Sequence, residues 1–333
     1  MSPTPSQSKR RTIACRSRGA MTVAGLVCCM ATPCRSAPAT NDLFVASFLT
    51  GNITRLDGSS GATIYSVPPA ASTINLAKGP DEALYVTTLF SSSVIRVDLA
   101  TGANLGNFAS GGGLSTATGV AFGPDGNLYV GSRDTNSIIR YNGMTGAFID
   151  TFVASGSGGI TAVEALLFGP DDNLYATEFS GNRVLRYDGA TGAFIDVFAA
   201  NPSLGGARSM AFGQDGNLYV AGNSSDNVVR FDGDNGAFLG VFATAIDGAN
   251  GIAFGPDGRL YVAAEVANEI SRFDETTGAF IDDFAAVSGP IGLFFDVMIV
   301  PEPGSIAVAG FMIAAVFVVR RGALLPICPD LSK

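Results

Sequence analysis

Six charged or amide side chains stand where the internal repeats of this 333-residue chain differ from one another. They are Glu164, Glu178, Arg208, Asn223, Asn250 and Glu265. Carboxylate and amide oxygens suit a hard divalent cation such as Ca²⁺, and a guanidinium binds a carboxylate or sugar hydroxyls. The set therefore predicts a ligand site, with Glu164, Glu178, Asn223 and Asn250 as the metal-binding alternative. The other interpretation is a solvated rim in which Glu164 and Arg208 are simply paired.

The composition excludes several kinds of chemistry. The chain has no histidine, which rules out Ser-His-Asp triads, His-Glu-x-x-His metal sites and histidine general bases. Between residues 41 and 300 there are 27 acidic and 11 basic residues. Such an acidic body repels phosphate backbones, so nucleic acid is not an expected partner.

The elements that must position these side chains come from a repeat. A Gly that precedes Pro or Gln marks it at positions 79, 123, 169, 213 and 255, with spacings of 44, 46, 44 and 42. In its clearest copy, Pro124-Asp125-Gly126 makes a tight turn between an apolar strand and Leu128-Tyr129-Val130. Two further strands complete each unit. Four antiparallel strands every 40–50 residues indicate a β-propeller.

The ends of the repeat predict how the ring closes. The first unit begins at its second strand, Leu43-Phe44-Val45, and residues 291–295 supply an unmatched first strand. Joining them gives an all-β, six-bladed propeller over residues 40–298, closed by the pairing of N- and C-terminal strands in one blade. Closure removes the exposed sheet edges.

The propeller predicts where the variable side chains lie. Residues before the central strand should ring one mouth of the channel: Ile74, Thr118, Glu164, Arg208 and Asn250. Loops after the second strand should open on the same face and present Thr88, Arg133, Glu178, Asn223 and Glu265. Asp232 to Gly236 resembles a calcium loop, but similar residues recur at this hairpin in other blades, so we interpret it as a turn.

The Gly-Pro-Asp-Gly-Asn-Leu-Tyr-Val signature at residues 123–130 resembles NHL-repeat propellers and the related gluconolactonase and streptogramin-lyase propellers. The gluconolactonase resemblance implies a divalent ion held by Glu, Asn and Asp in the channel. The streptogramin lyases rely on a histidine, which this sequence lacks, so the resemblance to them does not imply their activity.

Both ends read as targeting segments. Residues 1–39 have a basic start, an apolar stretch over 20–31 and a final Ala-Pro-Ala, typical of a signal peptide. Near the C-terminus, an apolar run at 306–319 lies between a proline motif and a basic pair. The motif residues are Val300, Pro301, Glu302, Pro303, Arg320 and Arg321. Segment 299–321 resembles a PEP-CTERM sorting tail, although residues 322–333 extend beyond the usual end; the alternative is a plain anchor.

These observations predict an exported, non-catalytic binding or scaffold propeller that needs no cofactor. The tail resemblance implies an exosortase-type membrane protease as a partner and a place at the cell surface or in the exopolysaccharide matrix of a Gram-negative bacterium. An exopolysaccharide or a surface protein is the expected ligand. The alternative is a lactonase or related hydrolase that uses Ca²⁺ or another divalent cation in the channel.

Overall fold

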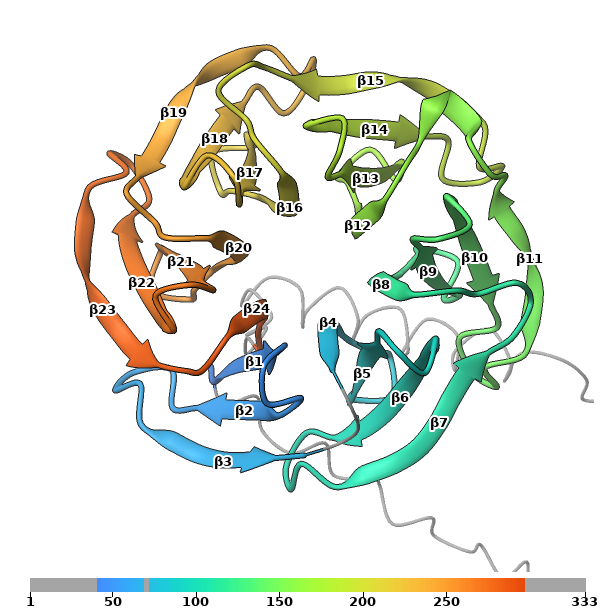
Figure 1. Cartoon of the computed structure of the whole chain (residues 1–333), viewed down its shortest axis with the longest axis horizontal. Helices are drawn as coiled ribbons and strands as arrows, with labels where there is room; N and C mark the ends of the chain where they lie inside the picture. The colour runs from blue at the N-terminus through green and yellow to red at the C-terminus, as the bar shows by residue number, and fades with distance from the viewer. Residues whose placement is uncertain (1–40, 69–71, 297–333) are drawn as a thin grey trace, which may run out of the picture. The chain divides into compact units, whose positions relative to one another are not determined.

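Each repeat forms a four-stranded antiparallel sheet, and six such sheets stand around a common centre (Figure 1). The computed structural model describes residues 41–68 and 72–296. Within them the expected six-bladed β-propeller is confirmed. The one helix in the described part of the chain is the short 3-10 turn η1 (Ser157–Gly159). No helix of these residues is long and apolar enough to cross a membrane.

We number the blades from the one that contains β1. Each blade has four strands, one in each of four concentric layers. The inner strands are β24 (Pro290–Phe295), β4 (Thr73–Lys78), β8 (Ala117–Phe122), β12 (Val163–Phe168), β16 (Ala207–Phe212) and β20 (Ala249–Phe254). The second strands are β1 (Leu43–Ser47), β5 (Ala83–Thr88), β9 (Leu128–Ser132), β13 (Leu174–Glu178), β17 (Leu218–Gly222) and β21 (Arg259–Ala264). The third strands are β2 (Ile53–Leu56), β6 (Ser93–Asp98), β10 (Ser137–Tyr141), β14 (Arg183–Tyr187), β18 (Asn227–Phe231) and β22 (Glu269–Asp274). The outer strands are β3 (Thr63–Val67), β7 (Asn104–Ser110), β11 (Phe148–Val153), β15 (Phe194–Ala200), β19 (Phe238–Thr244) and β23 (Phe280–Ala286).

The ring closes in the first blade, where the chain's two ends meet. Strand β24 pairs antiparallel with β1, and Leu43 lies opposite Phe295. The backbone N–H of Asn41 also donates to the carbonyl of Asp296 over 2.9 Å. Figure 1 shows β24 beside β1 at the centre of the ring. The predicted pairing is confirmed, and both ends of the described chain lie at the face where the inner strands end.

The Pro-Asp-Gly turns hold the first and second strands together. Gly126 has a φ of 75°, a conformation that side chains disfavour. The Asp125 carboxylate accepts from the backbone of Asn127 over 3.0 Å and from the Tyr129 hydroxyl over 3.0 Å. Tyr129 is fully buried, so the carboxylate satisfies a polar group inside the core. The repeated aspartate thus does more than shape the turn.

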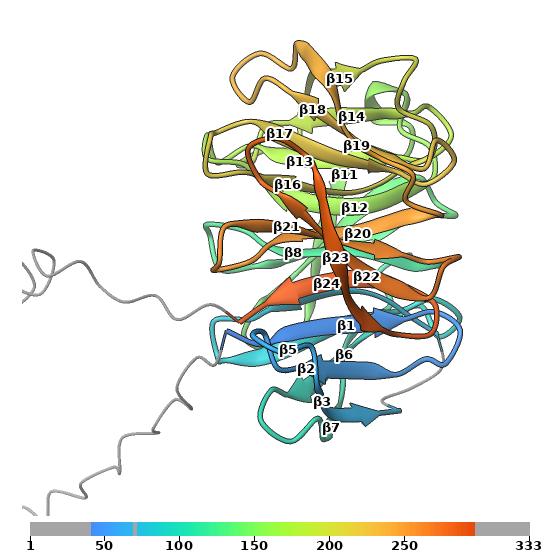
Figure 2. The ribbon, with the colours of Figure 1, turned by 90° about the vertical axis from the view of Figure 1, so that its left-hand side faces the viewer.

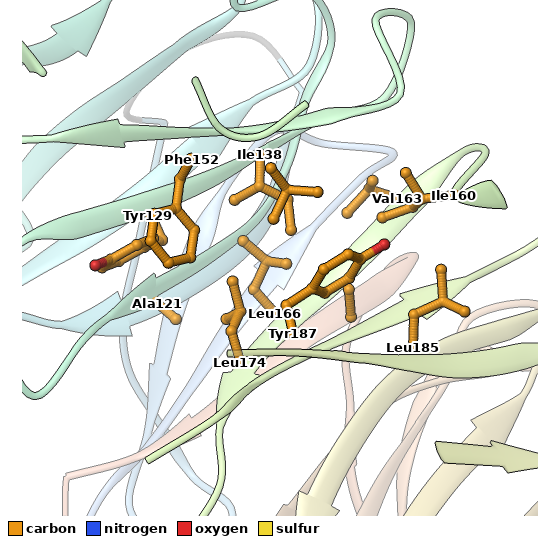
Figure 3. Packing of buried hydrophobic residues seen from close by; sticks show 12 residues of the cluster. Ala121, Tyr129, Ile138, Phe152, Ile160, Val163, Leu166, Leu174, Leu185 and Tyr187 are labelled. Carbon is orange, nitrogen blue, oxygen red and sulfur yellow. The ribbon is translucent and has the colours of Figure 1, made fainter. Parts of the chain in front are cut away.

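Tyrosines on the second strands join neighbouring blades. Tyr129 packs edge-to-face against Phe152 of its own outer strand and Phe168 of the next inner strand, with ring centroids 4.8 and 4.9 Å apart. Figure 3 shows Tyr129 and Phe152 within the apolar cluster between the third and fourth blades. Blades two to six repeat this aromatic triplet. The hydrophobic core therefore lies between neighbouring sheets. Figure 2 shows the sheets of the ring from the side.

Candidate functional site

A β-bulge near the start of each inner strand turns one side chain toward the centre of the ring. In the third blade, Ala117 lies opposite Ser132, whereas Val120 lies opposite Val130. Three steps along β8 therefore match two along β9, and the extra residue bends the strand. The inner strands of the other blades have an equivalent shift. The bulge is thus part of the repeat, while the side chain that it turns differs between blades.

The second residue of every inner strand lines one pocket of about 130 Å³, which we call the mouth pocket. These inner-ring residues are Ile74, Thr118, Glu164, Arg208, Asn250 and Ile291. The five positions that sequence places around one mouth do lie together, and Ile291 of the closing strand completes the ring. Because all six blades contribute, the pocket exists only when the ring is closed.

A second, outer ring comes from the residue that follows each second strand. Its members are Phe48, Leu89, Arg133, Phe179, Asn223 and Glu265. Phe48, Leu89, Arg133 and Glu265 also line the mouth pocket. The other two contact its walls: the Arg208 guanidinium lies 4.5 Å from the centre of the Phe179 ring, and Asn223 donates to Glu265 over 3.5 Å.

Glu178 and Thr88 are not members of this outer ring, and their sequence assignment is wrong by one residue. Both end their second strands, where Glu178 lies opposite Val163 and Arg183. A shift of one residue along a strand moves a side chain to the other face of the sheet. Glu178 accordingly accepts hydrogen bonds from Thr161 and Arg183. Phe179 occupies the position that the sequence assigned to Glu178, beside Arg208.

The mouth pocket has two chemically different halves. The first and second blades supply the four apolar side chains, Phe48, Ile74, Leu89 and Ile291, together with the amide of Asn75. The third to sixth blades supply the hydroxyl, guanidinium, carboxylate and amide groups. Because blades one and two are neighbours, the apolar side chains form one continuous wall. A ligand in this pocket therefore meets an apolar surface on one side and hydrogen-bonding groups on the other.

Glu164 is the most buried charged group of the mouth pocket. Its side chain is 4% exposed, and Oε2 accepts from Arg208 Nη1 over 2.8 Å. Arg133 Nε lies 3.4 Å from Oε1, at ion-pair distance, but Oε1 accepts no hydrogen bond within the described chain. Burial raises the pKa of the Glu164 carboxyl above its ordinary value, although Arg208 and Arg133 favour its ionised form.

Glu265 occupies the adjacent part of the polar half. Its Oε2 accepts from Asn250 Nδ2 over 2.8 Å and from Asn223 Nδ2 over 3.5 Å. The amides of the fifth and sixth blades therefore orient this carboxylate. Glu164 has arginine partners and Glu265 has amide partners, so the pocket contains two differently supported carboxylates and two guanidinium groups.

The four-residue metal set does not assemble. Glu164 is bound by arginine, Glu178 lies with Arg183, and Asn223 and Asn250 both turn their amide nitrogens to Glu265. No group of three or more acidic, cysteine or histidine side chains within the described ranges has metal-binding geometry. Calcium needs six to eight oxygens around one point. The residues present do not fit that requirement, and we derive no step through a metal.

The comparisons with known proteins identify the fold. Residues 91–240 match the family model described as outer membrane protein assembly factor BamB. No curated protein matches the chain in sequence. A chain of a nidogen/laminin complex is similar over 77% of this chain and 98% of its own length, with 17% identity and a TM-score of 0.66.

Two further solved structures are similar at the same level. A protein of unknown function from Bacteroides caccae has 14% identity and a TM-score of 0.58, covering 77% of this chain and 98% of its own. The virginiamycin B lyase of Staphylococcus aureus has 17% identity and a TM-score of 0.57, covering 78% and 91%. At these identities the likeness establishes the six-bladed propeller fold, which binding proteins and lyases share.

Sequence reasoning placed Ile74 at the mouth but missed the other three apolar residues of the site. In the sequence, Phe48 and Leu89 look like ordinary hydrophobic residues at the ends of strands. Ile291 looks like an ordinary residue of the closing strand. Counting five residues on from the leucine of each Leu-Tyr pair finds the outer ring in blades two to six, which is the available signal. The sorting-motif residues, from Val300 to Arg321, lie outside the described residues, as do segments 1–39 and 322–333.

Proposed function

We propose that this protein is an exported, non-catalytic propeller that binds a polysaccharide or a surface protein through the mouth pocket. The observation that carries the proposal is the mouth pocket itself, to which all six inner strands contribute a side chain. The residues of the repeat maintain the fold, whereas the residues turned into the pocket vary from blade to blade. Variation on a constant scaffold is typical of a binding site.

The position of the chain ends supports attachment without obstruction. Asn41 and Asp296 are hydrogen-bonded at the face where the inner strands end, and the mouth pocket is at the face where these strands begin. A propeller held at the cell surface through its C-terminal side would thus present the pocket outward. The signal-like residues 1–39 and the sorting-like residues 299–321 favour this location.

The chemistry of the pocket supports binding over catalysis. For the virginiamycin B lyase, a variant with alanine in place of a histidine is described as catalytically inactive, and this chain has no histidine. The Glu164 carboxylate lies between two guanidinium groups, with Oε2 accepting from Arg208 and Oε1 3.4 Å from Arg133. A general base must reach the proton that it removes, and these two arginines occupy the space beside both carboxylate oxygens.

Binding and turnover are tested together. The full chain is incubated with exopolysaccharide from its native cells, and co-sedimentation is measured while mass spectrometry follows the soluble sugars and added lactones. We expect saturable co-sedimentation with no new product. Steady release of product at a rate that scales with protein concentration would overturn the non-catalytic role.

Location is tested separately with an epitope-tagged full chain. We expect the protein in the surface and matrix fractions, and we expect a Val300–Pro303 deletion to retain it in the membrane fraction. Finding the intact protein in the cytoplasm would overturn the export proposal.

A further inference from the structure

Two buried polar atoms in the wall of the mouth pocket have no hydrogen-bond partner in the described chain. One is an acceptor, Glu164 Oε1, and the other is a donor, Arg208 Nε. Buried polar atoms are nearly always hydrogen-bonded, and an unpaired one costs about 1–3 kcal/mol. Glu164 lines the pocket with a side chain that is 4% exposed. The orphan acceptor therefore marks where a bound group should donate a hydrogen bond.

The charges around that oxygen restrict the donor. A cationic ligand would meet Arg133, 3.4 Å from Oε1, and Arg208, 2.8 Å from Oε2 of the same carboxylate. An anionic ligand would meet Glu164 itself and Glu265. Two guanidinium groups and two carboxylates leave the pocket with no formal net charge. The donor that best satisfies Oε1 is consequently a neutral hydroxyl.

The remaining walls restrict the body of the ligand. Phe48, Ile74, Leu89 and Ile291 offer an apolar surface opposite the polar groups, and Asn75 and Asn250 add amides. The volume of about 130 Å³ is roughly ten times the ~10–15 Å³ that one water needs. Because all six inner strands surround the pocket, a polymer enters it by an end. A sugar ring combines hydroxyls with an apolar C–H face and reaches such a pocket as a chain end.

We propose that the mouth pocket binds one neutral sugar residue at the end of a glycan, with a ring hydroxyl donating to Glu164 Oε1 and the C–H face against Ile74 and Leu89. This inference rests on the proposed binding function and specifies its ligand. The balanced charges of the pocket favour a neutral sugar residue. The apolar half of the pocket favours the orientation in which the C–H face of the ring contacts it.

The test titrates the full chain by calorimetry with methyl glycosides of neutral hexoses, with methyl glucuronide and with methyl glucosaminide. We expect saturable binding of at least one neutral glycoside and at least tenfold weaker binding of both charged sugars. Glu164→Gln should weaken binding about tenfold, because the hydrogen bond to a charged carboxylate becomes one to a neutral amide. Asp234→Asn, a matched change on an exposed hairpin between β18 and β19, should bind as the unmodified chain does.

Leu89→Asn provides a second variant, because Leu89 is only half-buried and its replacement changes the apolar wall without removing a buried charge. It should also weaken binding. Melting temperatures of all variants establish that each is folded, and if Glu164→Gln does not fold, Leu89→Asn decides the outcome.

The outcomes separate this inference from the function on which it rests. Preferred binding of the glucuronide or the glucosaminide would overturn the neutral-sugar inference and leave binding intact. Polysaccharide co-sedimentation that neither pocket variant changes would overturn both the sugar inference and the mouth pocket as the binding site, while polysaccharide binding itself would stand. If neither polysaccharide nor any glycoside binds, the sugar inference and the polysaccharide form of the proposed function both fail.

Discussion

Glu164 and Arg208 stand 44 residues apart, yet occupy the same position of two neighbouring inner strands and share a hydrogen bond of 2.8 Å. The repeat brings them together, because the bulge of each inner strand turns its second residue into the pocket. Their separation in sequence is therefore one repeat length. A site built in this way can change its chemistry through single substitutions that leave the propeller unaltered.

Removal of Arg208 should destabilise the ring. Arg208→Ala leaves the buried Glu164 carboxylate with Arg133 as its remaining cation, and we expect the free energy of unfolding to fall by about 2–4 kcal/mol. Urea denaturation measures the loss. In the Glu164→Gln/Arg208→Ala double variant much of this loss should be recovered, because no uncompensated charge remains. Strictly additive losses in the two variants would contradict a coupled pair.

The stability difference between the unmodified chain and Glu164→Gln should depend on pH. Burial raises the pKa of Glu164 in the folded state above its value in the unfolded chain, about 4.3. The folded state therefore binds this proton more tightly. As the pH falls from 7 through the raised pKa, the unmodified chain should gain stability relative to the variant, and the gain should level off below about pH 4.

That pH difference is measured by urea unfolding of both proteins at matched pH. Subtracting the two free energies of unfolding cancels the contributions of the carboxylates that both proteins share. A difference that stays constant from pH 7 to pH 4 would show that the carboxyl is not perturbed by folding.

The hydrogen bond between Tyr129 and Asp125 should contribute modestly to stability. Burial raises the pKa of Tyr129 to about 12, so its hydroxyl stays a donor at all physiological pH values. Tyr129→Phe should cost about 0.5–1.5 kcal/mol, and Tyr129→Ala about 3–5 kcal/mol, because the edge-to-face contacts with Phe152 and Phe168 are also lost. Phe44 occupies the equivalent position in the first blade, which shows that phenylalanine fits. Equal losses in the two variants, measured by thermal unfolding, would contradict this assignment.

Much of the fold could be predicted from sequence because the repeat is regular. The Pro-Asp-Gly turns and the unmatched strand at 291–295 determine blade number and closure, since both are local patterns with a known structural meaning. The site was harder to predict. Glu178 and Phe179 are adjacent in sequence, and a single-residue error in aligning the end of β13 exchanged a side chain of the outer ring for one that faces Arg183.

The apolar half of the pocket could not be recognised in the same way. Leu89 and Ile291 are ordinary residues for strand ends, and their common surface exists only because the ring closes. Sequence differences between blades reveal polar substitutions more readily than apolar ones, because an apolar residue also fits the core. Only the closed ring shows which apolar residues line the pocket and which belong to the core.

Divalent cations should not stabilise the protein through the mouth pocket. In thermal unfolding of the full chain with Ca²⁺, Mg²⁺, Mn²⁺ or Zn²⁺, and with EDTA as the control, we expect no saturable rise in melting temperature. A bound ion at 100 times its dissociation constant would add about 2.7 kcal/mol, which is readily measured. A saturable rise that disappears in Glu164→Ala would restore the metal-dependent hydrolase.

Gly119 sets the distance between the third and fourth blades at the mouth pocket. A Cβ at this position would lie 2.7 Å from the backbone nitrogen of Leu166 and 2.8 Å from the carbonyl carbon of Ala165. Because backbone atoms cannot move aside as a flexible side chain can, Gly119→Ala should force the two inner strands apart, at a cost of about 1–3 kcal/mol. The separation would also lengthen the Arg133–Glu164 contact, which spans the same two blades.

Ser209 provides the matched control, since it holds the equivalent bulge position in β16 and already carries a Cβ. Ser209→Ala should change the free energy of unfolding by no more than about 0.5 kcal/mol. Urea denaturation compares the two variants, and glycoside titration follows the mouth pocket. Because Ser209 itself lines the mouth pocket, it is a control for stability alone. Loss of both stability and binding in Gly119→Ala, with stability retained in Ser209→Ala, would connect the spacing of the blades to the ligand site. Full stability in Gly119→Ala would instead mean that the inner strands can separate without cost, and that their close approach does not shape the mouth pocket.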